Sequence, residues 1–410
     1  HMKTTATLAF PFLPFNLQPS SFIIHPYFFP FNVHPSTFIL TMTPPGYKQT
    51  EVGVIPEEWD AEKLGNFISL QRGHDLTWED RRRGDIPVMG SAGQNGCHDT
   101  AIVKGPGVVV GRSGASFGQA HYCEQDFWPH NTALYVTDFR GNDPLFVFYF
   151  LKAIDFSRHN SGGAQQSLNR NFIAPIPIGI PRPPEQRAIA TALSDMDALL
   201  AALDRLIAKQ RDLKQAAMQQ LLTGQTRLPG FTGKWETKRL GDVAHIKTGS
   251  RNNEDKVEDG QYPFFVRSEV VEHINSYSHD CEAILIPGEG RIGSIFHYIH
   301  GRFDVHQRVY AITQFKPDIS GRFIHFYLSK NFGAWAMQNT VKATVDSLRL
   351  PTFLTFEMKL PPTKAEQTAI ATVLSDMDLE LAALEQRRDK TRALKQGMMQ
   401  ELLTGRTRLA

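Results

Sequence analysis

The sequence has few cysteines and no long apolar run. Only Cys97, Cys123 and Cys281 occur among the 410 residues, and none lies in a Cys-x-x-Cys motif. Three cysteines cannot all pair with one another, so we expect reduced thiols and a cytoplasmic protein. The histidines show no metal-ligand spacing, and we expect neither a metal nor a cofactor. No apolar run reaches the roughly 20 residues of a membrane-spanning helix, so no membrane contact is expected.

An excess of one charge is also missing. The formal net charge is +2. Residues 48–182 carry 13 basic against 15 acidic side chains, and residues 229–360 carry 16 against 15. Neither segment therefore has a bulk positive field, and any anion-binding face must come from local arrangement of side chains.

Motifs for catalysis are missing as well. There is no Walker lysine loop, no His-Glu-x-x-His and no Asn/Asp-Pro-Pro-Tyr/Phe. Residues 288–293 fit Gly-x-Gly-x-x-Gly, but a dinucleotide site also needs that loop to open a helix. The residues that follow, 294–299, instead predict a strand. We therefore predict a non-catalytic chain without a dinucleotide or S-adenosylmethionine site.

The most informative feature is an internal repeat. Residues 185–228 and 366–409 are identical at 29 of 44 positions. Each copy follows a Pro-Pro pair and ends near a glycine, which favours a helix start and a helix stop. Apolar side chains recur at a 4-3 spacing typical of a coiled-coil seam: Ile189, Leu193, Met196, Leu200, Leu203 and Ile207, then Ile370, Leu374, Met377, Leu381 and Leu384. About 40 helical residues span roughly 60 Å, and we expect the two helices to pair antiparallel. Packing of each helix on a separate core is the alternative.

The segments before the two helices share a plan, because equivalent residues are separated by one constant offset in the numbering. Matching positions are Trp59 and Trp235, Gly73 and Gly249, and His130 and His306. The apolar runs 108–110 and 284–286 each lead into a glycine-rich loop. Short strand-like stretches between Gly, Pro and Asn turns predict mixed domains.

We therefore predict an α+β protein in which two globular mixed α/β domains are joined by two long antiparallel coiled-coil helices, with pseudo-twofold symmetry. The predicted parts are a Phe/Pro-rich leader, non-native or poorly ordered, at 1–42; a first domain, head 1, at 43–182; a central helix at 183–228; a second domain, head 2, at 229–360; and a C-terminal helix at 361–410.

This order of parts resembles the specificity subunit of type I restriction-modification systems, over residues 43–410. The strings that carry the resemblance are 47–56, 162–169 (Gly-Gly-Ala-Gln-Gln-Ser-Leu-Asn) and 221–224 (Leu-Leu-Thr-Gly). One departure is that 341–344 read Val-Lys-Ala-Thr where head 1 has Gly-Gly-Ala-Gln, so a glycine-rich backbone contact is not expected in head 2.

The resemblance implies a non-catalytic subunit whose heads are target-recognition domains. Each head would read one half of a bipartite, asymmetric site in double-stranded DNA. The helices would bind DNA methyltransferase subunits, two of them, and the assembly would include restriction/translocase subunits. Two alternatives stay open: a structural adaptor joining two protein-binding heads, and the recognition part of a fused methyltransferase or nuclease.

The candidate DNA contacts lie in the glycine-rich loops and in the polar segment before each helix. Arginine can bind phosphate or guanine, and Gln or Asn can read adenine. The candidates are Arg72, Arg112, Ser113, Gln165, Gln166, Asn169, Arg251, Arg291 and Lys342. Salt-bridged turn arginines and solvated loop amides are the alternatives, and Arg81–Arg83, surrounded by acidic residues, favours a solvated turn.

Overall fold

The structure is a computed structural model that describes residues 43–160, 166–339 and 347–409. The chain divides into His1–Pro45 and a compact unit, Gly46–Ala410, and the helices and strands of the described residues lie in the second unit. The predicted leader at 1–42 lies outside the described residues, and so do the candidates Gln165 and Lys342.

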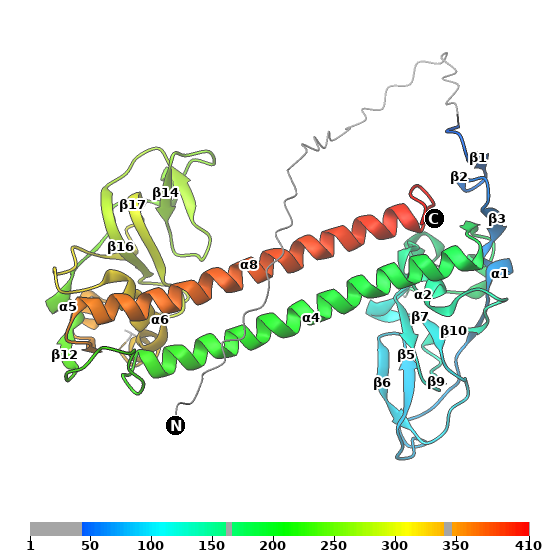
Figure 1. The fold of residues 1–410 in the computed structure, drawn as a ribbon, viewed down its shortest axis with the longest axis horizontal. Helices are drawn as coiled ribbons and strands as arrows, with labels where there is room; N and C mark the ends of the chain where they lie inside the picture. Colours follow the sequence, from blue (N-terminus) through cyan, green and yellow to red (C-terminus); the bar gives the residue numbers. More distant parts are fainter. Residues whose placement is uncertain (1–42, 161–165, 340–346, 410) are drawn as a thin grey trace, which may run out of the picture. The chain divides into compact units, whose positions relative to one another are not determined.

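Two helices of 39 residues, α4 (Pro183–Leu221) and α8 (Lys364–Leu402), lie side by side (Figure 1). Helix α4 begins with two prolines, whose missing N–H groups are not needed in a first turn. Helix α8 begins after Thr363, whose side-chain oxygen accepts a hydrogen bond from the Glu366 N–H at 3.3 Å. Both helices stop before a glycine with φ of 73°, Gly224 or Gly405, a conformation that favours glycine. The two predicted helices are confirmed.

Ion pairs join the antiparallel helices and the segments that follow their last turns. They occur in two related sets: Lys395–Asp197 with Lys214–Asp378, and Arg408–Glu185 with Arg227–Glu366. In each set, the two ion pairs are formed by equivalent residues of the two copies of the repeat. The predicted pseudo-twofold symmetry requires this equivalence. The seam is only partly apolar, because Leu203 and Ile207 of α4 are buried but so are Thr391 and Lys395 of α8.

The core of each head includes the start of one long helix and the end of the other. In head 1, Ile189 and Leu193 of α4 pack in the same buried cluster as Leu402 and Leu403. In head 2, the equivalent positions Ile370 and Leu374 of α8 pack in one cluster with Leu221 and Leu222. Burial of these apolar side chains anchors the heads at opposite ends of the helix pair (Figure 1).

Head 1 contains a four-stranded sheet of order β4-β10-β7-β8, a three-stranded sheet of order β6-β5-β9, and the two-stranded sheets β1-β2 and β11-β3. The strands are β1 (Tyr47–Thr50), β2 (Gly53–Pro56), β3 (Asp60–Lys63), β4 (Ser69–Arg72), β5 (Ile86–Gly90), β6 (Gly93–His98), β7 (Gly107–Gly111), β8 (Ala120–Cys123), β9 (Trp128–Pro129), β10 (Ala133–Asp138) and β11 (Pro177–Ile180). The α-helices are α1 (Leu64–Phe67), α2 (Pro144–Ala153) and α3 (Arg170–Ile173).

Head 2 contains a six-stranded sheet of order β13-β18-β16-β17-β14-β15 and the pair β12-β19. The strands are β12 (Glu236–Arg239), β13 (His245–Thr248), β14 (Tyr262–Phe265), β15 (Glu272–Ile274), β16 (His279–Pro287), β17 (His297–Val305), β18 (Val309–Thr313) and β19 (Glu357–Leu360). The α-helices are α5 (Leu240–Val243), α6 (Gly321–Gln338) and α7 (Leu350–Leu354).

The two heads have the same strand order. In head 1, β5 pairs in parallel with β9 through Val88 and Trp128; in head 2, β14 pairs in parallel with β17 through Phe264 and Asp304. Val88 corresponds to Phe264 and Trp128 corresponds to Asp304, at the same offset in numbering that relates Trp59 to Trp235. The nine-residue strand β17 covers the positions of β8 and β9 together, which merges the two sheets of head 1 into one sheet in head 2.

Each head attaches to its long helix through the Glu-Gln pair that begins the repeat. The side-chain oxygen of Gln186 accepts a hydrogen bond at 2.9 Å from the N–H of Asp143, the residue that caps α2. The side-chain oxygen of Gln367 accepts the equivalent bond, also at 2.9 Å, from Ser320, which caps α6. The repeat therefore preserves the residues that dock each long helix onto a second helix in its head.

Candidate nucleic-acid interface

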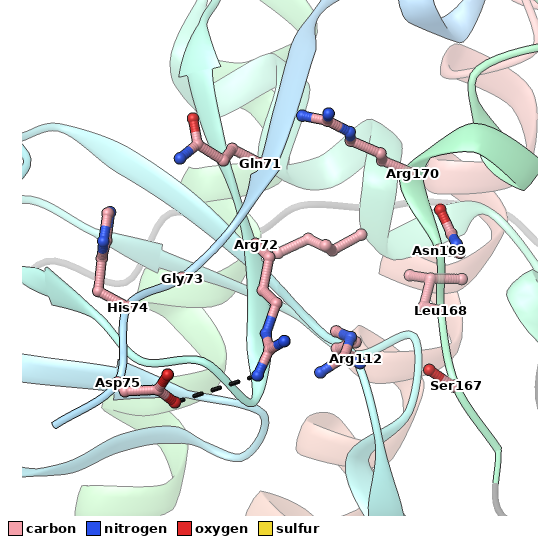
Figure 2. A pocket seen from close by; sticks show the side chains of 11 residues that line it. Gln71, Arg72, Gly73, His74, Asp75, Arg112, Ser167, Leu168, Asn169 and Arg170 are labelled. Atoms are coloured by element: carbon pink, nitrogen blue, oxygen red, sulfur yellow. Dashed lines mark ion pairs between the residues drawn. The ribbon is translucent and has the colours of Figure 1, made fainter. Parts of the chain in front are cut away.

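An open groove of about 790 Å³ in head 1 brings several predicted residues together. Its wall is formed by the end of β4, the residue after β7, and the segment that leads into α3 (Figure 2). The lining residues are Gln71, Arg72, Gly73, His74, Asp75, Arg112, Leu134, Ser167, Leu168, Asn169 and Arg170. Three candidates, Arg72, Arg112 and Asn169, therefore share one site although they are far apart in the sequence.

The groove is locally positive. Asp75 is the only acidic residue among those that line it, and its carboxylate lies 4.0 Å from the Arg72 guanidinium. Arg112 donates to the Asn131 carbonyl at 3.3 Å, and Arg170 donates to the Leu70 carbonyl at 3.5 Å. Backbone carbonyls leave the charge of both guanidinium groups uncompensated, so a phosphate or a guanine edge is a suitable ligand.

Backbone hydrogen bonds place Arg112 and Asn169 beside each other. The Arg112 N–H donates to the Thr132 carbonyl at 2.9 Å, and the Arg112 carbonyl accepts from the Leu168 N–H at 2.7 Å. Asn169 follows at once and caps α3, because its side-chain oxygen accepts the Asn171 N–H at 3.0 Å. Its amide nitrogen stays available at the groove, where it can donate to a base.

Two other candidates in head 1 lie outside the groove lining. Ser113 forms an isolated antiparallel bridge with Ser167, next to the groove wall. Gln166 lines a separate hollow of about 550 Å³ that also contains Lys152 and Asp155. The structure therefore separates Gln166 from Arg72 and Arg112, although its neighbour Ser167 contributes to the groove.

Arg251 in head 2 is paired with a buried carboxylate, although its own side chain is 42% exposed. Its Nε donates to Asp304 Oδ2 at 3.2 Å, and the Asp304 side chain is fully buried. Burial alone would raise the pKa of Asp304. Hydrogen bonds from Ser278, the Val305 N–H, Ser276 and Arg251 outweigh it and hold that pKa below its usual value. Arg251 therefore has a carboxylate partner within head 2.

Arg291 does not occupy the position that corresponds to Arg112. The Gly288 N–H donates to the Arg308 carbonyl and the Gly288 carbonyl accepts from the Leu348 N–H, both at 2.8 Å, which repeats the bonds of Arg112. Gly288 is thus the equivalent of Arg112. Arg291 lies on the exposed loop beyond, within 3.1 Å of Glu269.

The sequence missed several groove residues. Gln71, His74, Asp75 and Arg170 flank predicted positions, so their only signal was proximity to Arg72 and Asn169. In contrast, Arg81, Arg82 and Arg83 follow the turn at 78–80 and make contacts within head 1: the Arg81 side chain donates to the Asn95 carbonyl at 2.7 Å. Arg82 pairs with Asp99 at 2.7 Å, and Arg81 lies 5.3 Å from the ring centre of Trp78, which is 80% exposed.

Neither a cluster of metal-ligating side chains nor a membrane-spanning helix occurs among the residues that the structure describes. Residues 43–160, 166–339 and 347–409 contain no group of three or more His, Cys, Asp or Glu side chains suited to a metal ion. The same residues contain no helix that is both long and apolar enough to span a membrane. The Gly-x-Gly-x-x-Gly loop at 288–293 leads into β17 and not into a helix, so it lacks the strand-to-helix geometry of a dinucleotide loop.

Comparison with known proteins places the chain in a family. The family model for the type I restriction modification DNA specificity domain matches twice, at residues 56–210 and 232–392. The EcoDI specificity subunit of Escherichia coli is 33% identical over 156 residues, which is 37% of this chain and 34% of that protein. The putative MjaX specificity subunit of Methanocaldococcus jannaschii is 22% identical over 88% of this chain and 97% of its own length.

The fold agrees with that of a solved relative. The crystal structure of the S subunit of a type I restriction-modification system from M. genitalium matches 84% of this chain and 96% of its own, with a TM-score of 0.63 and 17% identity. The two matches of the family model each cover most of one head and of the long helix that follows it. The chain therefore belongs to the type I restriction-modification DNA specificity family, with one specificity domain in each half.

Proposed function

We propose that this chain recognises a bipartite, asymmetric sequence in double-stranded DNA, with each head reading one half. The observation that carries the proposal is the groove of head 1. Three arginines and one aspartate give it local positive charge in a chain whose head 1 has no net positive charge. Arg72, Arg112 and Arg170 suit phosphate or guanine, and Asn169 suits adenine.

Head 2 reads the second half in this proposal. Its strand order and its backbone bonds around Gly288 repeat those of head 1, so its equivalent loops face DNA in the same way. Arg251 and Arg291 stay in the proposal as weaker contacts, since both have carboxylate partners. Ser113, Gln165, Gln166 and Lys342 are proposed as flanking contacts.

The helix pair sets the distance between the two heads. A helix of 39 residues is about 58 Å long at 1.5 Å per residue. That length exceeds the roughly 34–36 Å of one helical turn of DNA, the distance at which successive openings of the same groove recur. Two heads fixed at opposite ends of the pair can therefore reach two half-sites with unread base pairs between them.

The repeated helices also give the chain two equivalent surfaces for a second kind of partner. We propose that two DNA methyltransferase subunits bind there, that restriction/translocase subunits complete the assembly, and that it works in the cytoplasm. The chain directs these subunits to DNA and supplies no catalytic residue of its own.

Exchange of one head tests the proposal. Residues 47–182 are replaced by the head 1 of another specificity subunit, and methylated sites are mapped across the genome of cells that carry the complete system. One half-site should change while the other half-site and the spacer stay the same. Exchange of residues 229–360 is the matched control and should change the other half. A chimera that methylates a site altered in both halves would contradict separate reading by the two heads.

A further inference from the structure

The heads differ at one equivalent position beside the proposed DNA surface. The carbonyl that accepts the Arg112 N–H in head 1 belongs to Thr132, and the carbonyl that accepts the Gly288 N–H in head 2 belongs to Arg308. The residue that follows Arg112 is Ser113, and the residue that follows Gly288 is Glu289. The backbone is the same at both places, because Ser113 bridges Ser167 and Glu289 bridges Ser347, each in antiparallel fashion.

In head 2 this position carries a three-residue ion cluster. Arg267 Nη1 lies 3.4 Å from one carboxylate oxygen of Glu289, and Arg308 Nη1 lies 3.3 Å from the other. The Glu289 side chain is 22% exposed, whereas both guanidinium groups are more than half exposed. One carboxylate is therefore shared by two arginines that stand on either side of it.

The cluster is the clearest case of a wider difference between the heads. All five arginines between β13 and β18 lie within 4.0 Å of a carboxylate: Arg251, Arg267, Arg291, Arg302 and Arg308. Among the five arginines in the equivalent part of head 1, described in full from β4 to β10, only Arg72 and Arg82 have such a partner. Arginines without a carboxylate partner are therefore more numerous in this part of head 1 than in the equivalent part of head 2.

A carboxylate at this position affects two kinds of binding differently. Non-specific binding comes from neutralising phosphates, and Glu289 both neutralises two arginines and repels phosphate. Specific binding can use the same arginines on a guanine edge, where the nearby carboxylate is also able to accept a hydrogen bond from cytosine. A carboxylate shared by two arginines therefore weakens non-specific DNA binding more than it weakens binding to the correct sequence.

We propose that Glu289 is a specificity-determining residue of head 2, which restrains Arg267 and Arg308 so that head 1 supplies most of the non-specific hold on DNA. This inference rests on the proposed DNA-reading function. Ser113 gives head 1 no such restraint, and Arg112 beside it is left to bind phosphate. Head 1 therefore provides most of the affinity for DNA of any sequence, and head 2 mainly discriminates between sequences.

The experiment compares Glu289→Gln with the unaltered chain, each bound to its methyltransferase partner. Affinity is measured by fluorescence anisotropy for a duplex with the mapped target site and for a scrambled duplex, between about 50 and 200 mM salt. We expect Glu289→Gln to bind the scrambled duplex about tenfold more tightly, with a salt slope steeper by about 1 to 2. The ratio of specific to non-specific affinity should fall.

Asp280→Asn is the matched control. It removes the same charge from head 2 and frees Arg302, whose Nε lies 3.0 Å from Asp280 Oδ2 in the β16–β17 ladder. The reciprocal variant, Ser113→Glu, should weaken binding of head 1 to the scrambled duplex. Circular dichroism and thermal unfolding confirm that each variant is folded.

The outcomes separate this inference from the function on which it rests. Equal gains from Glu289→Gln and Asp280→Asn mean that only bulk charge matters and overturn the role of Glu289. A weaker hold on the scrambled duplex in Glu289→Gln overturns it too. If the unaltered complex does not distinguish target from scrambled duplex, the proposed DNA-reading function itself is wrong.

Discussion

Head 1 and head 2 share a backbone and differ in where their charges lie. Gly73 and Gly249 illustrate what is shared: a Cβ at Gly73 would lie 2.2 Å from the His130 carbonyl oxygen, and a Cβ at Gly249 would lie 1.9 Å from the Val305 carbonyl oxygen. Arg112 and Gly288 illustrate what differs, since they occupy the same place in the two heads. The comparison shows that the fold fixes loop positions through the backbone and leaves the loop side chains free to diverge.

The ends of the helices show the same contrast. Glu185 binds Arg408 at 2.5 Å and also accepts a hydrogen bond from Trp59 Nε1 at 2.9 Å. The equivalent Glu366 binds Arg227 at 2.5 Å, but the indole nitrogen of Trp235 is buried without a hydrogen-bond partner among the described residues. The glutamate of this ion pair therefore accepts an additional hydrogen bond from a tryptophan only in head 1.

The largest expected effect concerns what the heads share. Gly249→Ala forces a methyl group against the Val305 carbonyl, where backbone atoms cannot yield, and should destabilise head 2 by about 3 kcal/mol or more. Gly73→Ala should do the same to head 1 through the His130 carbonyl. Urea unfolding measures the loss. Gly397→Ala is the control, because its Cβ meets nothing within 4 Å and should stabilise α8 by about 0.5–1 kcal/mol.

The second prediction concerns acid stability, which should differ between the heads. Burial lowers the pKa of His325 in α6 to about 4, with a contribution in the same direction from Arg322 and Lys214 and an opposing one from Asp378. Between pH 6.5 and 4 the unfolded chain then binds more protons than the folded one, so stability falls as the pH falls through this window.

Replacing His325 by phenylalanine, the residue at the equivalent position 148 of α2, should remove that dependence. We expect the free energy of unfolding of the unaltered chain to drop by about 2 kcal/mol between pH 6.5 and 4 through this group. His325→Phe should unfold with nearly constant stability over the same range. An undiminished acid loss in the variant would show that His325 is not its source.

The third prediction compares two aspartates related by the repeat. Asp197 accepts a hydrogen bond from Tyr149 Oη at 2.8 Å and binds Lys395 at 2.5 Å, whereas Asp378 binds Lys214 and has Phe326 at the place of Tyr149. Asp197→Ala should therefore cost about 1 kcal/mol more than Asp378→Ala, because it leaves an additional buried donor without a partner. Equal losses in thermal unfolding would remove this distinction between the two ends.

The smallest expected effect concerns single arginines in the proposed interface. Arg112→Ala should reduce the salt slope of binding to a scrambled duplex by about 1, because this guanidinium has no carboxylate partner to give up. Arg308→Ala should change the slope by less, because Glu289 already neutralises its charge in part. A larger change for Arg308 would reverse the assignment of roles to the two heads.

The candidate site could be predicted in part. Arg72 and Arg112 were proposed as arginines next to glycines, and Asn169 as an amide in the polar segment before the helix; all three line one groove in the structure. Arg251 and Arg291 were identified by the same reasoning, yet both have carboxylate partners. Residue type shows what a side chain can bind, but only the fold shows which charge already lies beside it.

Local patterns in the chain are enough to predict the two helices, their stops and the duplicated plan of the heads. These features are local or repeated: the apolar spacing, the prolines, Gly224 and Gly405, and the constant offset between the two heads all stand in the chain. The apolar runs at 146–151 and 323–328 lie in helices α2 and α6, a helical form that the sequence does not reveal, since apolar residues on every side give no readable period.

Which charged side chains have a partner of opposite charge depends on the folded arrangement of the chain. Glu289 and Arg267 are 22 residues apart in the chain, and Asp304 and Arg251 are 53 apart. Their pairing depends on how β14, β16, β17 and β18 lie beside one another in the sheet. Electrostatic energy depends on distance in space and on burial, and neither is written in the order of the residues.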